Sequence, residues 1–212
     1  MKTLFLVPAF ILLMACEKDA ADNSIPDNSN NGVEQVVIQN ELLLFLYEEE
    51  KLARDVYEYL DRAWGEKQFT NIKGSEQRHM EEVAKLLDNR GIIYPRLPEG
   101  HFKDSTLQNL YNSLIALGKQ SAVDALTVGA TIEDMDIVDI EKMKPDFTSD
   151  SSVLTVLNNL QCGSENHLRA FNRGLTQYQA DYHPQYLSAE QFAAIINSSQ
   201  QPCGKGKGKS RE

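Results

Sequence analysis

The chain has 212 residues, of which 42% are hydrophobic and 25% are charged, a composition typical of a globular protein with one well-packed domain. Asp and Glu outnumber Lys and Arg by 31 to 21, which gives a net charge of -10 at pH 7. Because a field of this sign repels nucleic acid and attracts cations, we expect metal ions, and no nucleic acid, among the partners.

The N-terminus has the pattern of a secretion signal. Lys2 precedes an apolar run that ends at Cys16 and is too short for a membrane-spanning helix. The last residues of the run, LMAC, resemble the lipobox of bacterial lipoproteins, which implies a lipid on Cys16; the alternative is an ordinary signal with a coincidental cysteine. We therefore expect a signal peptide over 1–15 and a flexible polar tether over 16–33. The protein would then be held at the membrane of a bacterial cell envelope, inner or outer.

The remainder of the chain shows helical spacing of its apolar residues and no sustained alternation of period two. This pattern predicts an all-α domain over 34–200, followed by a basic tail over 201–212 that we expect to be disordered. Long helices are predicted over about 34–64, 71–89, 122–143 and 151–178. A short helix is predicted over 105–118, within the long connection between the second and third long helices, and another after Ser188.

Each long helix carries a polar residue of a metal-ligand type where its apolar spacing predicts a buried position. These residues are Glu50, Glu76 with His79, Glu133 and His167. Burying an unpaired carboxylate costs several kcal/mol, so convergence on a cation would account for all of them together. Carboxylates with imidazoles suit iron or manganese, and also zinc. The sequence therefore predicts a non-haem metal site, with iron as the first candidate.

Four segments carry a resemblance to a known family: EEEKLARDVY (48–57), SEQRHM (75–80), GATIEDMDI (129–137) and GSENHLRAF (163–171). They resemble an uncharacterised bacterial and archaeal ferritin-like domain family of unknown function. The resemblance implies a ferritin-like four-helix bundle, with the extra short helix in the crossover and the short C-terminal helix.

The pattern is more distantly similar to rubrerythrin and other di-iron carboxylate bundles. That similarity implies Glu50 and Glu133 as single carboxylates and Glu76 with His79 as one Glu-x-x-His pair. The chain departs from it at Ser164, which stands three residues before His167 where a second glutamate is expected. The departure leaves open whether the site holds one ion or two.

Several residues near the predicted ligands are also assigned roles. Asp136, on the same face as Glu133, either replaces the missing carboxylate or lies at the surface. Asp134 is interpreted as a solvated acid. Arg54 can pair with Glu50, and Tyr57 can donate a hydrogen bond to the site. Of the acidic run at 48–50, Glu50 has the phase of a ligand.

Cys162 and Cys203 either form a disulfide or are two unrelated thiols. The expected function is an envelope lipoprotein that binds one or two non-haem metal ions, with redox chemistry on an oxidant or ferroxidase activity. The alternative is a metal-free structural or binding module with a vestigial site. The sequence leaves open whether the protein is an enzyme and whether it forms a homodimer.

Overall fold

A computed structural model describes residues 28–204. This part of the chain contains helices and no strands, so the predicted all-α class is confirmed for it. The predicted signal peptide, the predicted lipidation site at Cys16 and the last eight residues lie outside the described part. None of the described helices combines the length and the apolarity that a membrane span requires.

The described residues form six α-helices and one 3-10 helix. Their bounds are α1 Asn28–Trp64, α2 Lys67–Asn89, α3 Ser105–Gly118, α4 Ala122–Met143, η1 Lys144–Phe147, α5 Ser151–Gln177 and α6 Ala189–Asn197.

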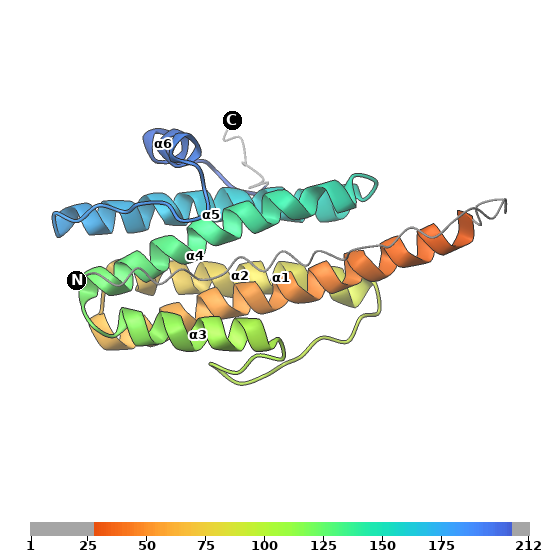
Figure 1. The fold of residues 1–212 in the computed structure, drawn as a ribbon, viewed down its shortest axis with the longest axis horizontal. Coiled ribbons are helices and arrows are strands. Elements are labelled where there is room, and N and C mark those ends of the chain that lie inside the picture. The colour runs from red at the N-terminus through yellow and green to blue at the C-terminus, as the bar shows by residue number, and fades with distance from the viewer. Residues whose placement is uncertain (1–27, 205–212) are drawn as a thin grey trace, which may run out of the picture.

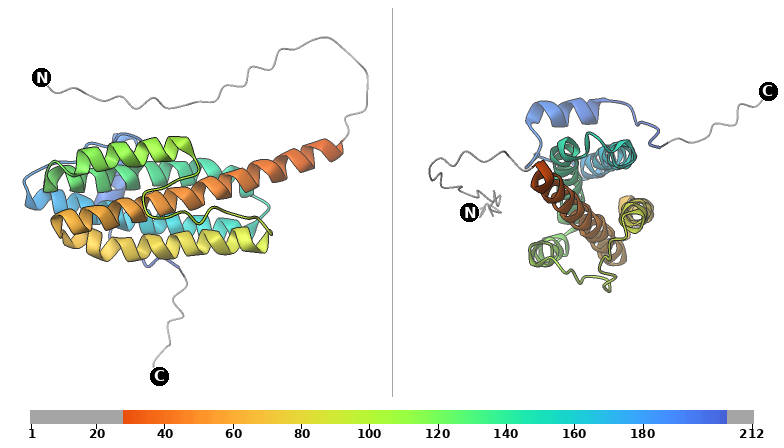
Figure 2. Two further views of the ribbon diagram at one scale, coloured as in Figure 1. Left: turned by 90° about the horizontal axis from the view of Figure 1, so that it is seen from below. Right: turned by 90° about the vertical axis from the view of Figure 1, so that its right-hand side faces the viewer.

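The long helices pack side by side. Helix α1 lies along α2, and α4 lies along α5 (Figure 1). The connection between α2 and α4 crosses over α1 and contains α3, which packs against α1 and α4 (Figure 2). Helix α6 lies across α5 (Figure 2). Each of the four long helices therefore turns one face toward a shared interior.

Two long helices begin earlier than their sequences predict. Helix α1 starts at Asn28, so residues 28–33, predicted as part of the tether, continue the helix. Their polar composition favoured a tether, but no proline between Pro26 and Glu34 interrupts the helical hydrogen bonds. This end of α1 extends beyond the other helices (Figure 2), and Val33 is 67% exposed.

Helix α2 starts at Lys67, after the turn at Gly65, rather than at about Asn71. Its first turn is stabilised by Phe69, which is fully buried. The ring of Phe69 lies 5.7 Å from that of Tyr57 and 5.3 Å from that of Phe171, measured between centroids. Because these partners come from α1 and α5, tertiary packing extends the helix beyond its local pattern.

A polar layer separates two apolar clusters in the interior. One cluster contains Leu52, Ile72 and Phe171, and the other contains Leu46 and Met80. On each long helix the predicted ligand falls between residues of the two clusters, which is why its apolar spacing is interrupted there. The fold thus places the polar residues of four helices at one level.

Two contacts hold the C-terminal segment: one corrects the prediction for Asp134, and the other decides between the two alternatives for Cys162 and Cys203. Asp134 is fully buried rather than solvated, and its carboxylate accepts hydrogen bonds from Tyr182 Oη and Leu187 N, both at 2.8 Å. The sulfur atoms of Cys162 and Cys203 lie 2.10 Å apart in a disulfide. Because this bond ties residues 201–204 to α5, the predicted disorder does not begin at residue 201.

Candidate metal centre

The predicted ligands converge from four helices into the polar layer. Glu50 comes from α1, Glu76 and His79 from α2, Glu133 from α4 and His167 from α5. The three glutamates are each 2% exposed. The side chains of the two histidines are 12% and 11% exposed. All five groups are therefore shielded from bulk water.

The geometry divides these side chains into two groups that share Glu76. In the first group, Nδ1 of His79 lies 2.9 Å from Oε2 of Glu76 and 3.3 Å from Oε2 of Glu50. In the second, Nδ1 of His167 lies 2.7 Å from Oε1 of Glu76 and 3.5 Å from Oε2 of Glu133. The candidate ligand atoms of each group all lie within 4.8 Å of one another.

The two imidazole rings that face the shared carboxylate are also stacked on each other. The ring centroids of His79 and His167 are 5.5 Å apart, and the ring planes are inclined by 28°. Each ring is matched with one carboxylate of its own, Glu50 or Glu133. The layer is therefore nearly symmetric about Glu76.

Several atoms of the site are buried without a hydrogen-bond partner among the described residues. They are Glu50 Oε1, Glu76 Oε1, His79 Nδ1 and His167 Nδ1. The carboxylate and imidazole atoms approach closely, but not with the angles of hydrogen bonds. Buried polar atoms normally have hydrogen-bond partners. A cluster of carboxylate and imidazole atoms without such partners is therefore suited to hold a cation between them. Two imidazoles with three carboxylates form a donor set that suits iron or manganese, and also zinc.

Mutual charges set the protonation of the metal-free site. Burial disfavours charge on every member, but His167 and His79 outweigh it at Glu76 and hold the pKa of that carboxyl below its usual range. Burial also opposes charge on His167, yet the carboxylates of Glu76 and Glu133 raise its pKa to about 10. Burial raises the pKa of Glu50 to about 7, although His79 acts against it. In the metal-free site the histidines are therefore protonated, and a metal ion would have to displace these protons to bind the imidazole nitrogens.

Tyr57 supports the site from α1, as its spacing from Glu50 suggested. The fully buried Tyr57 donates a hydrogen bond of 2.6 Å from Oη to Oε1 of Glu133. Oε2 of the same carboxylate faces His167. The tyrosine thus fixes the orientation of Glu133.

Asp136 lies beside the two groups and belongs to neither. It is 9% exposed and accepts a hydrogen bond from the hydroxyl of Ser164, the residue that stands where a second glutamate was expected. Burial raises the pKa of Asp136 well above its usual range, and the charges of Glu50 and Glu133 raise it further. The structure therefore puts a buried acid of α4 next to the serine of α5.

A glycine makes room for one of the histidines. A Cβ atom added at Gly163 of α5 would lie 2.6 Å from both Cε1 and Nε2 of His79. Such a separation is far inside van der Waals contact, so α5 can approach the imidazole this closely only with glycine at this position. No sequence pattern indicated this role of Gly163.

The acidic run of α1 is more buried than the sequence suggested. Glu48 and Glu49 are each 5% exposed. Glu48 accepts hydrogen bonds from the backbone nitrogens of Lys103 and Asp104 at 2.6 and 3.0 Å, so it holds the connection before α3. Glu49 accepts no hydrogen bond from the described residues, and its Oε2 atom is buried. None of the three acids of this run is a solvated surface group.

Arg54 does not pair with Glu50. Its guanidinium donates to Oδ1 of Asp55 at 2.6 Å and to Oε1 of Gln77 at 2.8 Å. The predicted pairing over one helical turn is replaced because the buried Asp55 offers a closer carboxylate.

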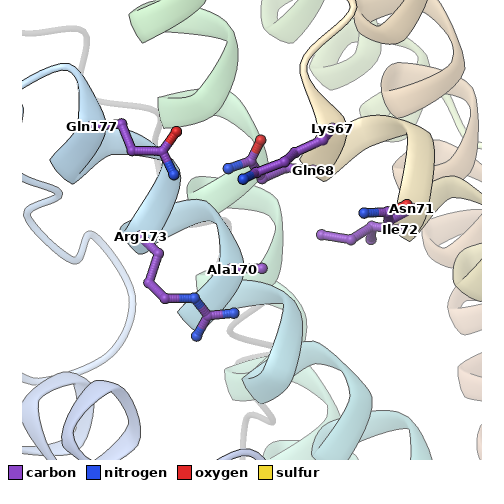
Figure 3. Close-up of a pocket in the computed structure, with 7 residues that line it drawn as sticks. All are labelled: Lys67, Gln68, Asn71, Ile72, Ala170, Arg173 and Gln177. Atoms are coloured by element: carbon purple, nitrogen blue, oxygen red, sulfur yellow. The ribbon is translucent and has the colours of Figure 1, made fainter.

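Two cavities lie near the long helices. A small one of about 10 Å³ touches the site between α1 and α4, and is lined by residues that include Glu49 and Glu50. A larger one of about 390 Å³ lies between the start of α2 and the end of α5, where Lys67 and Arg173 line it (Figure 3). None of the predicted ligands lines the larger cavity.

Comparison with known proteins identifies relatives of unknown function. The chain is 45% identical over 163 residues to the Uncharacterized protein MJ0754 of Methanocaldococcus jannaschii, covering 76% of this chain and 88% of that protein. The fold matches the crystal structure of hypothetical protein MJ0754 from Methanococcus jannaschii DSM 2661 with a TM-score of 0.74 and 40% identity. That match covers 87% of this chain and 100% of the other. The sequence profile described as Uncharacterized protein domain (DUF2202) matches residues 39–199, and the chain therefore belongs to this family.

Proposed function

We propose that the protein is a ferritin-like four-helix bundle that binds two non-haem metal ions, iron in the first place, with Glu76 as the shared carboxylate. The observation that carries the proposal is the position of Glu76, whose two oxygens face different histidines at 2.7 and 2.9 Å. Glu50 and His79 would complete one ion site, and Glu133 and His167 the other. Each ion would keep open positions for an exogenous ligand because few protein atoms surround it.

The size of the adjoining cavity limits the reactants. A space of about 10 Å³ has room for about one water molecule, which favours reactants of very few atoms. Bound iron would supply one-electron redox chemistry to such a small reactant, for example oxygen or peroxide. The function that fits is therefore oxidant-related redox or oxidation of Fe(II) itself, and an organic substrate would not reach the ions through this cavity.

The alternative is a metal-free module that keeps the polar layer for structural reasons. The contacts of His167 favour it: Nδ1 lies 2.7 Å from Glu76 and 3.5 Å from Glu133, whose charges overcome burial and raise the pKa of His167 to about 10, so that an imidazolium would be stable there without any metal. Charged pairs of this kind can compensate one another in a buried layer. The buried atoms of Glu50 and His79 that have no hydrogen-bond partner support metal binding instead.

We also propose that the domain is anchored to the cell envelope through a lipid on Cys16. The support is the sequence LMAC at the end of the apolar run. The disulfide between Cys162 and Cys203 agrees with an oxidising compartment outside the cytoplasm. Metabolic labelling with a radioactive fatty acid tests the anchor: the wild-type chain should take up label and Cys16→Ala should not, and an unlabelled wild type would contradict it.

Metal analysis of the purified protein tests the principal proposal. The full chain is expressed, and bound iron, manganese and zinc are measured after aerobic and anaerobic reconstitution. Wild type and the exposed-site control Glu81→Ala should retain metal, whereas Glu76→Ala should lose both ions and His79→Ala should lose the one expected beside Glu50. A wild-type protein that binds none of the three metals would favour the metal-free module.

A further inference from the structure

The small cavity beside the site is surrounded by acids. Carboxylates of Glu49, Glu50, Glu76, Glu133 and Asp136 contribute to its wall. Glu50, Glu76 and Glu133 belong to the two ligand groups, and Asp136 is hydrogen-bonded to Ser164. Glu49 has no such role.

Glu49 is a buried acid without a partner among residues 28–204. It is 5% exposed, and its Oε2 atom is buried and accepts no hydrogen bond. The preceding residue, Glu48, is buried to the same extent but is satisfied by two backbone N–H groups. A buried carboxylate without donors is costly, and a cation relieves that cost. The position of Glu49 on the cavity wall therefore favours transient binding of a cation.

The acids form a path from the surface to the site. Asp139, one turn after Asp136 on α4, has a side chain that is 29% exposed. Glu49 and Asp136 line the same small cavity, and Asp139 lies one turn further along α4, where its Oδ1 atom is 2.8 Å from Lys142 Nζ. Glu49 also adjoins Glu50 on α1. The path thus runs from an exposed acid through Glu49 to the first ligand group.

We propose that Glu49 receives divalent metal cations from solution and transfers them to Glu50 and Glu76, as the middle step of an acidic route between α1 and α4. This inference rests on the proposed metal-binding function. The transfer is a ligand exchange: a carboxylate oxygen replaces water on the ion, water leaves, and no electron moves.

The dimensions of the cavity explain why an acid is needed there. Because a volume of about 10 Å³ holds no more than one water molecule, an ion must shed most of its hydration shell to pass. Carboxylate oxygens compensate for the lost water, and their field concentrates cations at the mouth of the route. Without the carboxylate of Glu49, the partly dehydrated ion would have one fewer oxygen ligand as it passes Ala53 and Ile132.

The rate of Fe(II) uptake tests the route. Wild-type protein and Glu49→Gln, both expressed as the full chain, are mixed anaerobically with Fe(II), and unbound ion is trapped at intervals by a fast chromogenic chelator. We expect uptake by Glu49→Gln to be slowed by about tenfold, the lower end of the range for electrostatic focusing. The final number of bound ions should equal that of the wild type.

Two control variants separate charge from structure. Glu49→Asp, which keeps the charge, should take up Fe(II) at nearly the wild-type rate. Glu81→Gln, which removes an exposed acid from α2, should leave the rate unchanged. Circular dichroism checks that each variant is folded.

The outcomes distinguish this inference from the proposed function. If wild type binds metal and Glu49→Gln loads at the same rate, the route is wrong and the metal centre stands. If Glu49→Gln binds fewer ions at equilibrium, Glu49 is a ligand, and the transfer role is also wrong. If wild type binds no Fe(II), the proposed metal site fails and the route fails with it.

Discussion

Nδ1 of His79 lies 2.9 Å from Oε2 of Glu76, one turn earlier on α2, without the geometry of a hydrogen bond. Oε1 of the same glutamate faces the second histidine from α5 at 2.7 Å. A carboxylate that presents its two oxygens to two separate imidazoles would bridge the proposed pair of cations.

The two ligand groups predict different metal stoichiometries for different variants. Glu50→Gln should leave about one bound ion, because the group of Glu76, Glu133 and His167 remains intact. Glu133→Gln should leave the other ion for the same reason. Glu76→Gln should bind neither ion tightly. Metal analysis after equilibrium dialysis measures these numbers, and equal losses in all three variants would contradict two separate groups.

Replacement of Gly163 should damage one ion site and leave the fold intact. In Gly163→Ala the new Cβ would lie 2.6 Å from the ring of His79, so the imidazole must move. We expect loss of the ion held by His79 and Glu50. The control Gly74→Ala adds a methyl group whose nearest neighbour is Arg78 Nη1 at 3.9 Å. That variant should bind metal normally and gain about 0.5–1 kcal/mol of stability, because alanine favours a helix over glycine.

The hydrogen bond from Tyr57 to Glu133 should contribute to the stability of the metal-free protein. Tyr57→Phe removes the donor and leaves a buried acceptor, which should cost about 1–3 kcal/mol in the free energy of unfolding. Tyr59→Phe is the matched control, because Tyr59 makes no side-chain hydrogen bond within residues 28–204, and its effect should stay within about 0.5 kcal/mol. Urea denaturation measures both, and equal stabilities of the two variants would refute the assigned role of Tyr57.

Metal affinity should increase with pH. In the metal-free protein, the carboxylates of Glu76 and Glu133 overcome burial and raise the pKa of His167 to about 10, while burial raises the pKa of Glu50 to about 7. A metal ion must displace these protons, so binding near pH 6.5 should release protons and weaken as the pH falls. Calorimetry in two buffers with different ionisation heats counts the protons. Binding without proton release would contradict the assigned ligands.

The stability of the metal-free fold should decrease with pH. The pKa of His167 is about 10 in the fold and about 6.5 in an unfolded chain, so its charge stabilises the fold fully below pH 6.5. That contribution is lost as the pH rises toward 10. The Tm of metal-free wild type should therefore fall over this interval. The Tm of metal-free His167→Gln should change less, and an equal change would assign the effect to other groups.

Helical spacing was sufficient to predict the general plan. Residues three apart on a helix share a face, which is why SEQRHM alone put Glu76 and His79 together, and the structure has their atoms 2.9 Å apart. Interrupted apolar spacing likewise selected Glu50 among three consecutive acids. These predictions needed only the 3.6-residue period and the burial of one face of each helix.

Most of the errors concern contacts between residues that are far apart in the chain. Asp134 looked like a solvated acid because its hydrogen-bond partners lie at 182–187, and no local pattern indicates that this segment folds back over α4. The first turn of α2 depends on Phe69 packing against Phe171 of α5, which sequence periodicity cannot reveal. Gly163 has its role only because α5 passes next to His79. The details of a site between helices depend on such tertiary contacts, which the sequence of a single helix does not indicate.

Anomalous X-ray diffraction from crystals soaked in Fe(II) tests the central claim most directly. The account predicts two peaks at the iron edge, one among Glu50, Glu76 and His79 and the other among Glu76, Glu133 and His167. A single peak, or peaks only elsewhere in the protein, would contradict a pair of ions that share Glu76.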